Sequence, residues 1–450
     1  MLPDVPLLEI LYFYTTNSWI EAWHTLVHVC QKWRNLVFES PRRLNLRLYC
    51  RSTTPVMKII DVWPPIPIII VDYHLKNSRV DGICAALEHN DRIHEVDLNA
   101  IQSSQSERVL AAMNRPFPSL KRLHLAFTDE TAPVDPDLFL GGSAPCLQTL
   151  SVNGIPASGL PSLLLSAIHL VCLELCGIPH SGYISPTAVV TCLSVLTRLE
   201  SFTIGFESPR SRPGRNSRPL PSRPGTLLPV LTVLRFKGSS IYMEELVARI
   251  NVPLLRKLEI VFFHRPIFET PQLTQLISRT RQFKTHQEAF LVFSDWSASI
   301  SLDGVLEFKI LCRQPDQQLR SLAQVCNSSF PQILLPTVWD LYVVPEDGFS
   351  QLRWPEDIES SQWLELFRPF TGVEDLSVSR ECLPHIASAL GTLVGERVTE
   401  VLPVLQTVSL EDTFLSESGP IQESIGQFAA ARWLVNRLIA VSCWDRELSD

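Results

Sequence analysis

The hexamer LKRLHL, residues 120–125, is one copy of a pattern, L-x-x-L-x-L, that recurs through most of the chain. From Val96 to Leu258, the fourth positions of successive copies are 23 to 32 residues apart. A pattern that returns at such intervals predicts one structural unit stacked many times, each covering its neighbour's apolar face. The other copies are IHEVDL (93–98), LQTLSV (147–152), LVCLEL (170–175), LESFTI (199–204), LTVLRF (231–236), LRKLEI (255–260), VWDLYV (338–343), VEDLSV (373–378) and LQTVSL (405–410).

Each hexamer has the alternation expected of a strand. In a strand, the fourth and sixth positions point to one face and the fifth position points to the other. The leucines therefore predict a buried face, and the fifth positions predict an open face of the sheet. The candidate target-facing strand positions are His124, Ser151, Glu174, Thr203, Arg235 and Glu259.

Helix-like stretches lie between the hexamers and begin with proline or polar residues suited to a helix start. A strand and a helix in each repeat, with a period of about 20–29 residues, are typical of leucine-rich repeats. We therefore expect an α/β fold class, with a leucine-rich-repeat-like solenoid, or horseshoe, over residues 93–450. The clearest helix-like stretches are SQSERVLAAMN (104–114), SPTAVVTCLSVL (185–196), YMEELVARI (242–250) and PQLTQLISRT (271–280).

Three segments depart from the regular repeat. The interval between the hexamers at 255–260 and 338–343 contains two strand-like runs, 288–295 and 305–312. The segment 207–226 is rich in arginine, proline and serine, so we expect a disordered basic insert that is either simply solvated or binds an acidic partner. The alanine-rich run that ends the chain predicts a capping helix near 421–444, because a solenoid must cover its last apolar face.

The bulk composition limits the class of protein. The chain has 450 residues, 45% of them hydrophobic, and a net charge of −8. Its length predicts several domains or an open-ended array, and its acidic balance excludes a general attraction to nucleic acid or an anionic membrane. Eleven irregularly spaced cysteines predict free thiols and a cytoplasmic or nuclear location. The apolar run 160–178 contains Pro161, His169 and Glu174, so we expect a helix joined to a buried strand instead of a membrane span.

The first 45 residues predict helices that are incompletely buried on their own. In residues 2–14, Asp4 is suited to be the N-cap, and apolar side chains cover the following helix almost all round. A unit of this size buries too little surface to stand alone, so we expect a partner chain to complete it. A second helix is predicted over residues 21–37, with an apolar stripe of Trp23, Leu26, Val27, Cys30, Trp33 and Val37.

Three motifs in this segment resemble those of the F-box: Leu2-Pro3-Asp4, Leu7-Leu8-Glu9-Ile10 and Val29-Cys30-x-x-Trp33-Arg34. The phrases WHTLVHVC, SPRRLNL and PIPIII extend the resemblance to the F-box proteins with irregular leucine-rich repeats of mushroom-forming fungi. The F-box is a small all-α module that binds the Skp adaptor of cullin-RING ubiquitin ligases. The resemblance implies a substrate-recognition subunit that binds a Skp-type adaptor, and through it cullin, at residues 1–45. Its solenoid is then expected to bind an unknown protein substrate.

The resemblance also assigns roles to single residues. It implies adaptor contacts by Leu2, Pro3, Leu8 and Leu11, and an F-box core of Ile10, Val29, Cys30 and Trp33. Residues 46–92 would then be a linker and the first edge of the solenoid, because Pro64, Pro65 and Pro67 disfavour a central strand. Residues 15–21 lack the leucine-rich second helix of the family. The alternative hypothesis is therefore a non-catalytic repeat scaffold or recognition protein with a vestigial F-box.

No motif predicts an enzyme. The chain lacks G-x-S-x-G, G-x-x-x-x-G-K-[ST] and G-x-G-x-x-G. His24 and His28 are one helical turn apart, but the glutamate of the zinc-binding helix motif is missing. In the set His169, Cys172, Cys176 and His180, a strand would hold the cysteines too far apart for one zinc ion. We therefore expect no catalytic residue, no metal and no cofactor, and neither nucleic acid nor a membrane as a partner.

Overall fold

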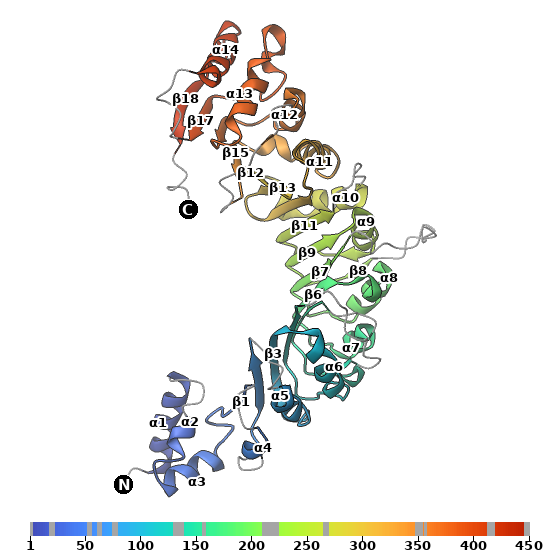
Figure 1. The fold of residues 1–450 in the computed structure, drawn as a ribbon, viewed down its shortest axis with the longest axis vertical. Helices are drawn as coiled ribbons and strands as arrows, with labels where there is room; N and C mark the ends of the chain where they lie inside the picture. Colours follow the sequence, from blue (N-terminus) through green and yellow to red (C-terminus); the bar gives the residue numbers. More distant parts are fainter. Residues whose placement is uncertain are drawn as a thin grey trace. The chain divides into compact units, whose positions relative to one another are not determined.

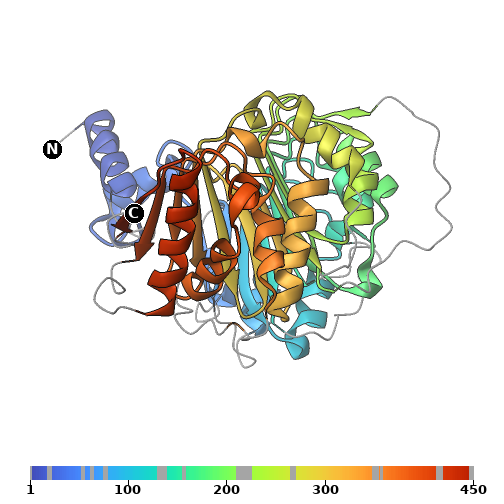
Figure 2. The same cartoon turned by 90° about the horizontal axis from the view of Figure 1, so that it is seen from above.

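The computed structural model divides the chain into two compact units, Met1–Ser211 and Arg212–Asp450. In each unit, parallel strands form most of a sheet, and the connecting helices lie along one face of it (Figures 1 and 2). Within the described residues, we find no helix that is both long and apolar enough to cross a membrane. The structure describes residues 3–17, 23–51, 56–60, 65–73, 80–128, 139–154, 159–208, 225–263, 270–346, 354, 358–411 and 419–444.

The described residues before the first strand are helical. The helices are α1 (Asp4–Asn17), α2 (Trp23–Leu26) and α3 (Gln31–Glu39). Leu7, Leu8 and Leu11 share one face of α1 because they are three and four residues apart, and all three are buried. Trp23 is also buried, and its Nε1 donates a hydrogen bond to the carbonyl of Arg47 at 2.9 Å. These side chains form the core of the N-terminal segment, and α1 packs against α3 within it.

The single helix predicted over residues 21–37 is wrong, because a turn separates α2 from α3. In this turn the carbonyl of Val27 accepts a hydrogen bond from Nε of Arg34 at 2.9 Å, so a side chain replaces the helical donor. The turn interrupts the predicted apolar stripe. As a result, Cys30 is exposed and Trp33 is only half-buried.

The strands of the first unit follow one another in chain order, and each neighbouring pair is parallel. They are β1 (Leu48–Cys50), β2 (Ile68–Asp72), β3 (Ile93–Ile101), β4 (Arg122–Phe127), β5 (Thr149–Asn153), β6 (Cys172–Ile178) and β7 (Ser201–Phe206). Leu123, Leu150 and Leu173 stand opposite one another on β4, β5 and β6, and all are buried. The predicted hexamers are therefore strands, and their leucines form one continuous buried row.

Short helices connect these strands on one side of the sheet (Figure 1). The apolar run 160–178 forms α7 followed by β6, as predicted. Among the described residues of the unit, the helices after the first three are α4 (Val56–Ile59), α5 (Val80–Leu87), α6 (Ser103–Ala112), η2 (Phe139–Gly142), α7 (Leu160–Ser166), η3 (His180–Gly182) and α8 (Pro186–Leu193).

The beginning of this sheet differs from the prediction for residues 46–92. β2 lies between β1 and β3, so it is an internal strand, and β1 forms the edge. Pro65 and Pro67 precede β2, so neither removes a donor from its ladder. The carbonyl of Pro67 instead accepts a hydrogen bond from the N–H of Leu48 at 2.8 Å, which helps to align β1. Pro64 lies outside the described residues.

The sheet of the second unit contains an antiparallel excursion. In spatial order its strands are β9 (Val233–Gly238), β11 (Lys257–Phe263), β14 (Leu306–Leu311), β13 (Ser297–Leu302), β12 (Glu288–Ser294), β15 (Asp340–Pro345), β16 (Asp375–Val378), β17 (Thr407–Glu411) and β18 (Ala440–Trp444). β13 is antiparallel to both of its neighbours, whereas all the other pairs are parallel. Three strands therefore fill the long interval between two hexamers, where the sequence predicted only two.

The helices of the second unit cover one face of this sheet (Figures 1 and 2). They are α9 (Ser240–Val247), α10 (Pro271–Arg279), η4 (Arg281–Phe283), α11 (Pro315–Ser328), η5 (Leu335–Thr337), α12 (Ser360–Phe367), α13 (Leu383–Gly391), η6 (Gly395–Thr399) and α14 (Pro420–Leu434). A separate parallel pair joins β8 (Thr226–Leu227) to β10 (Ile250–Asn251). Residues 209–224 of the predicted basic insert lie outside the described residues.

The capping helix predicted near 421–444 is too long, because α14 ends at Leu434 and a strand follows. The N–H groups of Asn436 and Arg437 close back on the last helical turn at 3.0 and 2.9 Å, and Asn436 has φ 56°. This is the hydrogen-bond pattern of a Schellman motif, in which asparagine tolerates the left-handed conformation. The described end of the unit keeps exposed apolar side chains at Trp433, Leu434, Val435, Leu438 and Val441.

Candidate protein-interaction surfaces

The predicted adaptor contacts in α1 are placed differently by the structure. Leu8 is 7% exposed and Leu11 is fully buried, so neither presents a surface to another chain. Both leucines lie on the face of α1 that packs inside the N-terminal segment, and their predicted contact with an adaptor stays a prediction. Pro3 is exposed. Leu2 lies outside the described residues.

The predicted F-box core is also placed differently. Ile10 is 50% exposed, Val29 is 57% exposed and Cys30 is exposed. Trp33 is half-buried, so it contributes in part to the core as predicted. The reason lies in the turn between α2 and α3, which carries Val29 and Cys30 to the outside. The actual core uses Trp23 and the three buried leucines of α1.

The outward side of this segment forms what we call the N-terminal apolar surface: Val5, Ile10, Phe13, Tyr14 and Val29. Their exposed fractions run from 41% for Tyr14 to 69% for Phe13. Isolated exposed apolar residues are common, but five within residues 3–39 make this segment a candidate site of association. The sequence predicted apolar side chains on all sides of α1. In the structure, leucines occupy its buried side, and aromatic and β-branched side chains occupy its exposed side.

Two ion pairs connect α1 to the rest of the N-terminal segment. Nζ of Lys32 lies 2.8 Å from Oδ1 of Asp4, which joins α3 to the first turn of α1. Arg43 pairs with Glu9, on the exposed side of α1. Exposed pairs of this kind contribute little stability, on the order of 0–1 kcal/mol each. The burial of Leu7, Leu8 and Leu11 therefore contributes more to the orientation of α1 than these pairs do.

A second surface is the open face of the sheet in the first unit. His124, Ser151, Glu174 and Thr203 stand side by side on β4, β5, β6 and β7, in one row across the strands. Each is half-buried between two fully buried neighbours, so the predicted orientation of these fifth positions is confirmed. Their predicted role in binding a target stays a prediction.

Three of these side chains form hydrogen bonds across the strands. Nε2 of His124 lies 2.8 Å from Oδ1 of Asn99, and Oγ of Ser151 donates to Oε2 of Glu174 at 2.9 Å. A ligand on this row would have to replace these bonds. Oγ1 of Thr203 is buried and has no partner among the described residues.

The corresponding row in the second unit is strongly charged. Nε of Arg235 donates to Oε2 of Glu259 at 2.6 Å, and Nζ of Lys257 lies 2.6 Å from Oε1 of Glu259. Burial opposes ionisation of Glu259, but these two hydrogen bonds outweigh it and hold its pKa below the ordinary value. On the next strand, burial and repulsion from Glu259 raise the pKa of Glu307. The predicted positions Arg235 and Glu259 are therefore neutralised within the sheet.

A third surface, which the sequence reasoning missed, lies further along the open face of the second unit. We call it the acid–aromatic patch: Glu288 and Phe290 on β12, Asp340 and Tyr342 on β15, and Asp375 on β16. The rings of Phe290 and Tyr342 are stacked, with centroids 4.6 Å apart and planes 9° apart. Burial, followed by repulsion from Asp375 and Glu288, raises the pKa of Asp340. The patch therefore concentrates negative charge beside an aromatic pair.

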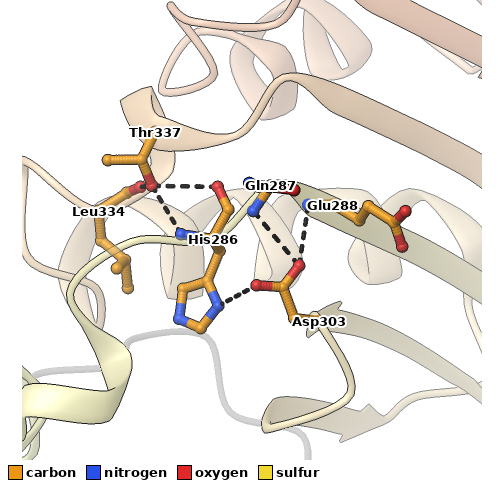
Figure 3. Close-up of polar contacts among 6 residues, drawn as sticks. All are labelled: His286, Gln287, Glu288, Asp303, Leu334 and Thr337. Carbon is orange, nitrogen blue, oxygen red and sulfur yellow. Dashed lines mark hydrogen bonds and ion pairs between the residues drawn. The ribbon is translucent and has the colours of Figure 1, made fainter.

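Hydrogen bonds from Asp303 and Thr337 position the start of β12 relative to the segment before β15 (Figure 3). The carboxylate of Asp303 accepts hydrogen bonds from the N–H groups of Gln287 and Glu288, at 3.3 and 2.9 Å, and lies 2.9 Å from Nδ1 of His286. Oγ1 of Thr337 accepts from the N–H of His286 at 3.0 Å. Asp303 thus fixes the start of β12, and Thr337 ties it to the segment that leads into β15.

The sequence contained a signal for this patch. Asp340 and Tyr342 are the third and fifth positions of the hexamer VWDLYV, so the rule that placed His124 on the open face also places both of them there. Phe290 had no such signal, because EAFLVFSD does not match the hexamer. Only the antiparallel excursion brings β12 beside β15.

Metal-ligating and thiol side chains are the remaining groups to consider among the described residues. No three His, Cys, Asp or Glu side chains among them are placed to hold one metal ion. Every cysteine whose side chain is described is a free thiol. Burial raises the pKa of the Cys382 thiol to about 12 and also raises the pKa of Cys326. Neither thiol is a ready nucleophile at neutral pH.

Comparisons with known proteins leave the family open. No protein-family model matches the chain, and the search of curated proteins finds no match. One solved structure that matches is the leucine-rich repeat-containing protein LegL7 from Legionella pneumophila, at 13% identity and a TM-score of 0.26. The match covers 85% of this chain and 97% of that chain. At so low a TM-score the likeness carries no argument, and the fold rests on the strand registers described above.

Proposed function

We propose that this protein is the substrate-recognition subunit of a Skp–cullin–F-box ubiquitin ligase. The observation that carries the proposal is the N-terminal apolar surface, which an all-helical segment presents outward next to a repeat sheet. The motifs around Leu7-Leu8-Glu9-Ile10 and Val29-Cys30 support the proposal by their resemblance to the F-box. In this role the helical segment binds a Skp-type adaptor, and the open sheet face binds the protein to be ubiquitinated.

We assign the adaptor contacts to exposed residues of α1 that differ from those implied by the resemblance. Ile10 and Phe13 are 50% and 69% exposed, three residues apart on α1, and so lie on one face. Full burial of one such side chain contributes about 1.5–3 kcal/mol, so a few residues of this surface can provide most of the affinity for the adaptor. Leu8 and Leu11 contribute indirectly, because they hold α1 in place.

The proposed role needs no catalytic side chain in this chain. A receptor that binds both ligase and target raises the effective concentration of the target's lysines near the conjugating enzyme. The protein is therefore proposed to be a non-enzymatic subunit in the cytoplasm or nucleus, without a cofactor.

Co-purification with a Skp-type adaptor tests this proposal. The double variant Ile10→Asp/Phe13→Asp should remain folded, because both side chains are largely exposed, and should lose the adaptor. Ile333→Asp is the matched control, because it places the same charge at a 76% exposed isoleucine in the second unit. If the double variant retains the adaptor as well as the control does, the N-terminal apolar surface is not the binding site.

One observation favours the second candidate, a non-catalytic scaffold or recognition protein with a vestigial F-box. Leu8 and Leu11, which the family resemblance assigns to the adaptor, are buried in this chain. The two candidates differ in one result. The intact, folded protein binds a Skp-type adaptor if it is a ligase receptor, and does not bind it if the F-box is vestigial.

A further inference from the structure

The stacked pair Phe290–Tyr342 lies in an unusual row of the open sheet face. Register places Ser301 of β13 opposite Phe290, and Ser377 of β16 opposite Tyr342. The aromatic pair is thus flanked by a small side chain on each side. Both rings are half-buried, so part of each aromatic side chain remains accessible. This is a platform on which a planar cation can stack.

The neighbouring row carries the negative charge. Glu288, Asp340 and Asp375 are in register on β12, β15 and β16, two residues from the aromatic row on the same face. Among the described residues, none of the three carboxylates forms an ion pair with a lysine, arginine or histidine. Glu259 and Glu346, on the same sheet, are both paired with lysines. The acid–aromatic patch therefore has negative charge that its own sheet does not neutralise.

The electrostatics of the patch favour a cationic ligand. The pKa of Asp340 is raised by burial and then by Asp375, Glu288 and Glu374, and no positive side chain offsets these effects. A divalent metal ion is a poor fit, because no three acidic groups of the described residues converge on one point. A guanidinium group suits the patch better. Its flat face can stack on an aromatic ring, while the N–H groups at its edge donate hydrogen bonds to carboxylates.

We infer that the acid–aromatic patch binds an arginine-bearing, extended segment of a protein partner. The guanidinium stacks on the Phe290–Tyr342 platform and donates hydrogen bonds to Asp340 or Asp375. Glu288 and Glu374 attract further positive charge along the segment. The inference rests on the proposed function in one respect, because it takes the segment to belong to the target protein. It follows that the target carries a basic recognition sequence.

Direct binding to the full-length chain tests the inference without any adaptor. The probe is a fluorescently labelled peptide of alternating arginine and serine, and its counterpart has citrulline, which keeps the shape but not the charge, in place of arginine. Fluorescence anisotropy should show binding of the arginine peptide that weakens with salt, and little binding of the citrulline peptide.

Two variants locate the binding. Asp340→Asn/Asp375→Asn keeps side-chain size and should weaken binding about tenfold, because the guanidinium loses its charged acceptor whichever of the two aspartates it contacts. Tyr342→Leu should weaken binding about fivefold, because it removes half of the platform. The control Glu365→Gln/Glu396→Gln removes the same charge from exposed positions in helices of the same unit and should bind like the wild type.

Two results would overturn the inference. One is equal binding by the wild type and Asp340→Asn/Asp375→Asn, and the other is equal binding of the arginine and citrulline peptides. Adaptor co-purification is measured on the same preparations. If the chain binds the adaptor but not the arginine peptide, the proposed function stands and only this inference is refuted. If the chain binds the peptide but not the adaptor, this inference stands and the ligase role is refuted.

Discussion

Two neighbouring residues of α1 give opposite predictions for stability. Leu11 is fully buried, and Ile10 is 50% exposed. Leu11→Ala removes apolar atoms from a closed core and leaves a cavity, which costs about 2–5 kcal/mol. Ile10→Ala removes atoms that are already half in water, so its cost is about 1 kcal/mol or less. The family resemblance alone predicts the reverse, because it places Ile10 in the core and Leu11 at the adaptor.

Hydrogen exchange of the α1 amides, followed by mass spectrometry of the full-length chain, measures this difference locally. A global unfolding curve is less suitable, because two compact units need not unfold as one. A loss of about 2 kcal/mol corresponds to about thirtyfold faster exchange through local opening. We expect at least this acceleration in Leu11→Ala and a much smaller one in Ile10→Ala. Faster exchange in Ile10→Ala than in Leu11→Ala would refute the orientation of α1.

Two further predictions concern the second unit. Burial and neighbouring acids raise the pKa of Asp340. Above that raised pKa, the negative charge of Asp340 lowers the stability of the fold. This destabilisation disappears below the ordinary aspartate pKa of about 3.9, where the side chain is protonated in both the folded and the unfolded state. Asp340→Asn should therefore raise the Tm at neutral pH and leave it unchanged at a pH below about 3.9. A lower Tm at neutral pH would contradict the repulsion between Asp340 and its acidic neighbours. Arg432 is fully buried and donates to the carbonyls of Val398, Leu402, Pro403 and Leu405 at 3.1–3.3 Å. Arg432→Met leaves these carbonyls without these donors and should cost at least about 2 kcal/mol, measured as faster hydrogen exchange of the α14 amides. Unchanged exchange would show that the carbonyls find other donors.

The repeat strands were predictable because their signal is redundant. Leu123, Leu150 and Leu173 each occupy the same position of a hexamer, and the parallel register aligns them. A strand has only two faces, so one buried leucine also fixes the orientation of its neighbour, as it did for Ser151 and Glu174. The pattern says less about partners: it gave no sign that Ser151 donates to Glu174.

β13 escaped prediction because its sequence, SASISL, is mostly small and polar. The hairpin that joins β13 to β14 was nevertheless signalled by Asp303-Gly304. Both residues have positive φ, and the N–H of Val305 donates to the carbonyl of Leu302 at 3.0 Å across them. The end of α14 had a comparable signal in Asn436. In both places the turn residues held information that apolar periodicity did not.

In the N-terminal segment, the sequence pattern alone does not determine how the helices pack. Apolar side chains surround α1, so periodicity cannot say which face turns inward. That choice depends on how α1 packs against α3, which is a tertiary feature. The structure buries Leu8 and exposes Ile10, whereas the resemblance implies the opposite sides.

The most direct test of the account is calorimetric titration of the purified full-length protein with a purified Skp-type adaptor. The account predicts a saturable complex with one adaptor per chain, and loss of the heat signal in Ile10→Asp/Phe13→Asp but not in Ile333→Asp. No binding by the folded wild-type protein would contradict it, and would leave the chain as a repeat protein whose exposed N-terminal side chains serve another purpose.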